Sequence, residues 1–197
     1  NIRGDNLDHA SWIITINQAE LVRNNQKLNF ENLQIDAEHR ADIHRIKLNS
    51  DYINAELVGQ YKSTTIYQSL KNMAFSYLPV FVDQKKDTAA VKAQNDFKLN
   101  IKLNNTQKIT NIFFPGLSIH DSSQVKLQYN GNKKSFTFSA KSQKFNYKGY
   151  NFQDLNLTSR SQDSIFSLVF RFNKLKSLTG RKSSYFHNFE LKSLTGN

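Results

Sequence analysis

The sequence lacks cysteine, has little proline and glycine, and contains no long apolar run, and each of these shortages narrows what the chain can be. With no cysteine among 197 residues, it can form neither a disulfide scaffold nor a thiolate metal site, a composition compatible with an oxidising compartment. No run reaches the roughly 18 apolar residues that a membrane-spanning helix requires. Proline occurs twice and glycine seven times, whereas Phe (15) and Tyr (8) are abundant. Aromatic residues in an otherwise polar chain are typical of sheets with one apolar face, in which every second residue is polar.

Catalytic and metal-binding motifs are also missing. The sequence has no Walker loop, no GxSxG and no GxGxxG motif. Its histidines are scattered without metal-type spacing, at His9, His39, His44, His120 and His187. We therefore expect no enzyme activity, no cofactor and no metal site.

The charge is strongly basic, with 27 Lys and Arg against 16 Asp and Glu, a net +11. The basic residues are spread along the polar positions of nearly every expected strand instead of clustering with aromatic residues. This distribution favours a solvated basic exterior over a nucleic-acid interface, and it is compatible with contact to anionic lipid headgroups.

A period of two dominates residues 122–159. Apolar residues alternate with polar ones in three runs, separated by turns at residues 130–132 (NGN) and at Lys148-Gly149. The phase slips at Gln153-Asp154, as a β-bulge would cause. This pattern predicts antiparallel strands with one apolar face.

The same alternation predicts a meander over most of the remaining chain. Strands are expected at 11–17, from 19 onward, at 28–37 with a phase slip at Glu31-Asn32, near 46–48, and at 53–61, 97–103 and 165–172. Residues 23–26 form a polar turn. Residues 28–35 resemble residues 150–157, which suggests an array that grows by adding hairpins. Residues 175–180 recur as residues 191–196, a repeat that a recent local duplication also explains.

Two segments change to a helical period. The first is a helix insert at 62–79, whose apolar stripe contains Ile66, Leu70, Met73 and Tyr77; we expect this stripe to cover the apolar face of the sheet. Residues 83–95 read as a mobile loop. A short helix is predicted from Thr106, which we expect to cap it, and it ends at Pro115-Gly116.

Several stretches carry a resemblance to a known family. They are residues 51–61 (DYINAELVGQY), the helix ending at Tyr77-Leu78-Pro79, residues 112–119 (IFFPGLSI) and residues 147–157 (YKGYNFQDLNL). The chain resembles the TamB (translocation and assembly module) family of the AsmA-like group, especially its Bacteroidetes members. The resemblance implies an elongated, curved antiparallel sheet, a β-taco or open hydrophobic trough. It further implies a bacterial periplasmic location, a parent protein anchored in the inner membrane, transfer of phospholipid between membranes, support of outer-membrane protein assembly, and a TamA-like outer-membrane barrel as partner through regions outside this chain.

Residues 1–197 would then be one trough segment inside a longer repetitive protein. Its apolar phase supplies the candidate residues for lining a lipid groove: Ile14, Ile16, Leu33, Ile35, Ile53, Leu57, Leu99, Ile101, Leu103, Val125, Leu127, Tyr129, Phe136, Phe138, Leu155, Leu157, Phe166, Leu168 and Phe170. Phospholipid acyl chains suit such a face because they need no directional contacts. Two alternatives remain open at this point: an outer-membrane β-barrel with the apolar residues outward, and a cell-surface β-sandwich that binds or adheres, although Trp12 is the only tryptophan.

Overall fold

The computed structural model describes residues 2–3, 10–62, 65–66, 95–133, 135–162, 165–177 and 184–196. The protein is an all-β structure in which α2 is the one helix whose bounds lie within these residues, as the alternation predicts. Its elements are β1 (Ile2–Arg3), β2 (Ser11–Arg23), β3 (Gln26–Arg40), β4 (Ile43–Ser50), β5 (Ile53–Gln60), β6 (Asp96–Leu103), α2 (Thr106–Phe113), β7 (Leu117–Ile119), β8 (Gln124–Asn130), β9 (Ser135–Tyr147), β10 (Tyr150–Gln162), β11 (Ile165–Ser177) and β12 (Ser184–Gly196).

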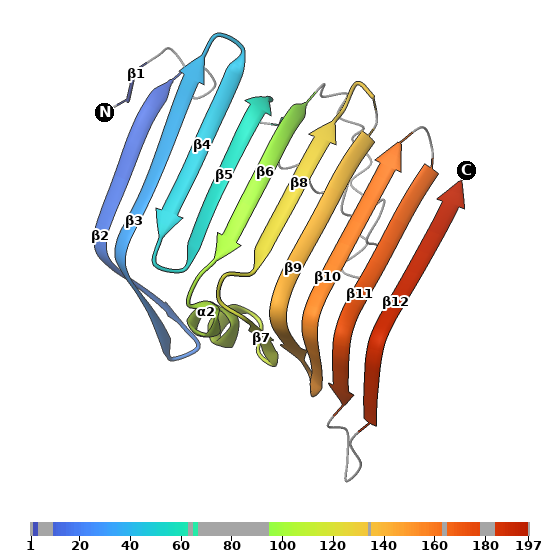
Figure 1. Cartoon of the computed structure of the whole chain (residues 1–197). Coiled ribbons are helices and arrows are strands. Elements are labelled where there is room, and N and C mark those ends of the chain that lie inside the picture. The colour runs from blue at the N-terminus through green and yellow to red at the C-terminus, as the bar shows by residue number, and fades with distance from the viewer. Residues whose placement is uncertain are drawn as a thin grey trace.

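The strands form one open antiparallel sheet in which sequence neighbours lie side by side (Figure 1). The order runs from β1 through β6 to β8 and on to β12, while β7 lies off this path and pairs with β9. The predicted meander is therefore confirmed. Because the order is linear, the first and last strands lie at opposite edges of the sheet.

Two of the predicted turns have the geometry of tight hairpins. Asn24 and Asn25 both have positive φ (49° and 61°), and so do Lys148 and Gly149 (46° and 87°). Two consecutive residues of this kind form the type I′ turn, whose twist matches that of the flanking strands. The turns predicted at residues 23–26 and 148–149 are confirmed.

The long strands bend at a residue with left-handed backbone, namely Gln18 in β2, Asp154 in β10 and Asn188 in β12. The pairing register is the same on both sides of each bend: Asn17 pairs with Asn32, and Ala19 pairs with Phe30. No residue is inserted. The expectation of a bulge at Gln153-Asp154 is therefore wrong, since the alternation of side chains changes phase at the same level in the neighbouring strands. The expectation of a separate strand from residue 19 is also wrong, since β2 continues through the bend.

The bends keep the apolar residues on one face. Phe152 precedes the bend of β10 at Asp154, whereas Phe170 pairs with Leu157, which follows that bend. The ring of Phe152 is nevertheless 5.9 Å from that of Phe170 and 5.4 Å from that of Phe172. A residue with left-handed backbone reverses the alternation of side chains. The observed phase slips therefore extend the apolar face along the full strand.

The helix α2 lies at one end of the sheet, where it contacts β7 and β3 (Figure 1). Its Ile112 packs with Leu28 and Tyr52, which are 1% and 2% exposed. The short helix is confirmed, but its predicted cap is wrong. The N-cap residue is Asn105, which makes no side-chain capping bond. The Thr106 N–H instead donates to the carboxylate of Asp121, 2.7 Å away.

Most of the helix insert expected at 62–79, and all but the last residue of the loop expected at 83–95, lie outside the described residues. Thr65 and Ile66 are helical, and Ile66 packs against the core cluster formed by Tyr61, Phe97, Leu127 and Phe136. For Ile66, the first residue of the stripe, this contact agrees with the expected packing on the apolar face. The other three residues, Leu70, Met73 and Tyr77, lie outside the described residues. Within the described part of the chain, no helix is long and apolar enough to span a bilayer.

Candidate functional site

The apolar face consists of rows of side chains that cross the sheet. One row starts at Ile14 at one edge and ends at Leu191 at the other, because each of its members pairs directly with the next. The row is Ile14, Ile35, Leu48, Ala55, Ile101, Val125, Ala140, Leu157, Phe170 and Leu191. Directly paired residues point to the same face. Ten strands at a spacing of about 4.8 Å make this row roughly 43 Å wide.

The register places all of the predicted groove residues on this one face. A second row contains Leu57, Leu99, Leu127, Phe138 and, beyond Ser159, Leu168. Tyr129, Phe136 and Phe166 belong to a third, and the remaining predicted residues extend the same alternation on their own strands.

The face also includes residues that the sequence-based set omits. Phe97 pairs with Tyr129, Ile46 pairs with Leu57, and Phe172 stacks on Phe189 at a centroid distance of 5.0 Å. The same period of two predicts that these residues lie on the apolar face.

Exposure varies across the face. At the centre, Leu127 and Phe136 are each 6% exposed. Toward the edges the face opens: Ile14 and Ile16 are 45% and 40% exposed, and Leu191 is 50% exposed. The centre is therefore a packed core, whereas the flanks present apolar side chains at the surface.

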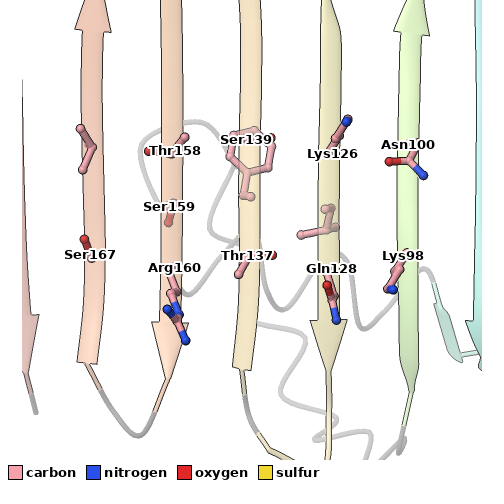
Figure 2. A pocket seen from close by; sticks show the side chains of 13 residues that line it. Lys98, Asn100, Lys126, Gln128, Thr137, Ser139, Thr158, Ser159, Arg160 and Ser167 are labelled. Carbon is pink, nitrogen blue, oxygen red and sulfur yellow. The ribbon is translucent and has the colours of Figure 1, made fainter.

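The opposite face is polar and contains a hollow of about 480 Å³ (Figure 2). It crosses five neighbouring strands, β6 and β8–β11. Three cationic side chains, Lys98, Lys126 and Arg160, lie among neutral polar ones. The neutral polar residues on this face of the hollow are Asn100, Gln128, Thr137, Ser139, Thr158 and Ser167. Val169 also borders the hollow and pairs with Thr158, so it is an apolar side chain on the polar face. Leu127, Phe138 and Ser159, which border the hollow as well, belong to the apolar phase of their strands.

Two histidines that are scattered in the sequence lie side by side in the structure. His39 and His44 pair across the hairpin of β3 and β4, with their Nδ1 atoms 3.4 Å apart. The spacing of five residues around a two-residue turn was the available signal. No group of three or more potential metal ligands occurs within the described ranges.

Comparison with known proteins identifies no relative of this chain. The chain matches no family model, no curated protein and no solved structure. The two faces of the sheet are therefore the features that bear on its function.

Proposed function

We propose that the apolar face binds phospholipid acyl chains and shields them from water. The observation that carries this proposal is the continuity of the apolar rows from edge to edge. A face that only stabilised the fold would be covered by packed side chains throughout. Here the flanks leave large apolar side chains such as Ile14 and Leu191 exposed at the surface.

The dimensions of the face suit a lipid. An acyl chain occupies about half of the ~30 Å hydrocarbon core of a bilayer, roughly 15 Å. An eight-residue strand such as β5 is about 27 Å long. A chain can therefore lie along the strands or across several of them. Covering exposed apolar surface contributes roughly 25 cal/mol per Å² and needs no specific contact.

The resemblance to the TamB family extends the proposal to a place and a partner. On that reading, the sheet is a periplasmic segment that conducts or shields acyl chains between the inner and outer membranes. It supports outer-membrane protein assembly together with a TamA-like barrel that contacts other regions of the parent protein.

Photocrosslinking tests the proposal with controls built into each strand. A photoreactive amino acid replaces Ile14, Ile101 or Phe138 on the apolar face, and the protein is mixed with phospholipid vesicles. The matched controls replace Thr15, Lys102 and Thr137, which are the next or preceding residues and point to the other face. Mass spectrometry then counts the lipid adducts at each position.

We expect adducts at the three apolar positions and few at the controls. Equal labelling of both faces, or no labelling of either, would contradict the lipid-binding role and leave a purely structural sheet. Lipids that co-purify with the protein, identified by the same instrument, would show which headgroup is preferred.

A further inference from the structure

Exposed apolar side chains are concentrated on the two outermost long strands, β2 and β12 (Figure 1). Large apolar residues that are at least 40% exposed number five on β2 and four on β12. They are Ile13, Ile14, Ile16, Leu21 and Val22, and Phe186, Phe189, Leu191 and Leu194. The set includes residues of the polar face: Ile13 lies one residue from Ile14, and Leu194 pairs with Ser167. Lipid on the apolar face would leave these two side chains uncovered.

The outer edges of these two strands are open to pairing within the described part of the chain. There, β12 pairs only with β11, and the outer side of β2 pairs only with β1, at Ser11 and Trp12. Such an edge is a template for a strand of another chain. Short length, proline and many charges commonly protect an edge. β2 and β12 instead each have 13 residues, no proline and two charged residues.

The two edges are complementary in direction. The strands β2–β6 and β8–β12 follow one another across the sheet, and each neighbouring pair is antiparallel. Because the number of these strands is even, β2 and β12 run in opposite directions. A second copy in the same orientation therefore presents its β2 antiparallel to the β12 of the first copy, with both apolar faces on the same side.

The two edges are also complementary in register. Both strands change phase at a bend, which lies at Asn17-Gln18 in β2 and at His187-Asn188 in β12. When the two bends lie opposite each other, the apolar residues pair as Ile14 with Leu191, Ile16 with Phe189 and Ala19 with Phe186. A shift by one residue would place each of them opposite a residue of the polar face. In the unshifted register Ile13 and Leu194 are diagonal neighbours on the polar face.

From this complementarity we propose that β12 of one copy pairs with β2 of a second copy, so that copies of this chain join edge to edge in one antiparallel sheet. The interface is heterologous, because it joins two different edges. Each copy keeps a free edge, so the assembly grows beyond a dimer unless it closes into a ring. The apolar rows of successive copies become continuous. The pairing depends on the edges alone, and lipid binding is not required for it.

The absence of cysteine allows a direct test by disulfide crosslinking without lipid. One sample of the full chain carries Ile14→Cys and the other carries Leu191→Cys. Directly paired residues have Cα atoms about 4.5–5.5 Å apart, a separation that a disulfide can span. We expect a linked dimer when the two samples are mixed under mild oxidation, and none from either sample alone. The matched control mixes Thr15→Cys with Leu191→Cys; Thr15 points to the other face, so this mixture should form no linked dimer.

Sedimentation velocity gives a second readout. The average mass of the native chain should rise with concentration, whereas Leu191→Lys should stay at the monomer mass of 22.8 kDa, because a charge on an edge strand opposes pairing. The control, Ile165→Lys, adds the same charge at a side chain that is 51% exposed, against 50% for Leu191, but lies on the inner strand β11. It should associate like the native chain. Circular dichroism confirms that each variant is folded.

Three results would overturn the proposal. Leu191→Cys that links to itself as readily as to Ile14→Cys would show that β12 pairs with a second β12 instead. A disulfide within one copy of a chain that carries both substitutions would show that the sheet closes on itself. A native chain that keeps the monomer mass at every concentration, with no linked dimer from the mixed samples, would show that the edges do not pair between copies.

Discussion

Gly59 is the residue at which the sheet tolerates no side chain. A Cβ atom added there would be 2.1 Å from the carbonyl oxygen of Asp96 and 2.5 Å from the Cα atom of Phe97, both backbone atoms of the paired strand β6. We expect Gly59→Ala to lower the free energy of unfolding by about 3 kcal/mol, at the upper end of overpacking costs. Urea denaturation measures the loss.

Gly149→Ala is the matched control for this substitution. Gly149 has a positive φ of 87° and nothing within 4 Å of the added Cβ atom. Its substitution should therefore cost only the backbone penalty, about 1–2 kcal/mol. An equal or smaller loss at Gly59 would contradict the close approach of β5 and β6.

Tyr52 gives the protein a pH dependence at high pH. Burial of its ring, followed by the nearby carboxylates of Asp51 and Glu31, raises the pKa of the Tyr52 hydroxyl above its ordinary value of 10.0. The hydroxyl donates to the carbonyl oxygen of Asn29. Because the folded state holds the proton more tightly than the unfolded state, this contribution to stability is complete below pH 10 and is lost as the pH rises toward the folded pKa.

We therefore expect Tyr52→Phe to be less stable than the native protein by about 1 kcal/mol at pH 8, the typical worth of a hydrogen bond. The difference should shrink above pH 10, because phenylalanine has no proton to lose. Urea denaturation at several pH values between 8 and 11 measures it. A difference that stays constant over this range would refute the assignment.

At the scale of single elements, α2 depends on a carboxylate that lies after it in the chain. Asp121 accepts the Thr106 N–H at 2.7 Å, and the Thr106 hydroxyl donates to the carbonyl oxygen of Ile119. Asp121→Ala should therefore cost about 1 kcal/mol, as the loss of an N-cap does. Hydrogen exchange of the α2 amides should accelerate by the factor that corresponds to this loss of free energy. The control, Lys108→Ala, changes an exposed side chain within α2 and should leave the exchange rates unchanged. Unaltered exchange in Asp121→Ala would show that the cap is dispensable.

The bend of β2 depends on a residue that accepts left-handed backbone. Gln18 has φ 57°, a conformation that is unfavourable for side chains branched at Cβ. We expect Gln18→Val to destabilise the protein by about 1–2 kcal/mol. Asn17→Val, one residue earlier in ordinary extended backbone, should be neutral or slightly favourable. Thermal unfolding of the two variants should separate them; equal melting temperatures would indicate that β2 has no such bend.

At the scale of the whole molecule, the continuity of the apolar face should matter more than any single side chain. Phe138 is half-buried on this face, next to the core residue Leu127. Phe138→Arg would place a charge across the rows, at a cost of several kcal/mol against hydrocarbon. We expect it to abolish lipid adducts at Ile101, whereas Phe138→Leu should leave them nearly unchanged. Equal adduct yields in the two variants would contradict a continuous lipid surface. Leu127→Asp is the poorer choice, because that side chain is 6% exposed and its loss would unfold the core.

Much of the fold was predictable from alternation, and what was not predictable depends on contacts distant in sequence. Most strands and the shared face of the groove residues follow from a period of two, and the turns at residues 24–25 and 148–149 follow from the polar residues between the apolar runs. β1, β7 and β12 were not among the predicted strands. The cap of α2 could not be predicted, because Asp121 is 15 residues from Thr106. The bends could be located from the phase slips. The geometry of the bends could not be predicted, since a change of phase shared by two paired strands leaves the same sequence pattern as a bulge in one of them.

The candidate sites were likewise predictable only in part. The apolar face was evident from the sequence, but its buried centre was not, because exposure depends on what packs above Phe97 and Leu127. The hollow was hidden for another reason. Lys98, Lys126 and Arg160 are more than 60 residues apart from first to last, and only the register brings them to one place.

The side-by-side order of the strands has a consequence for how the chain reaches its native state. Nearly every strand finds its partner one hairpin away, so the entropy lost in closing each loop is small. The exceptions are β5 with β6, which residues 61–95 separate, and β6 with β8, which α2 and β7 separate. The logarithmic dependence of loop closure keeps even these costs modest. A chain that emerges from its N-terminus, as during synthesis or export, can therefore add strands in succession, each newly placed strand serving as the template for the next.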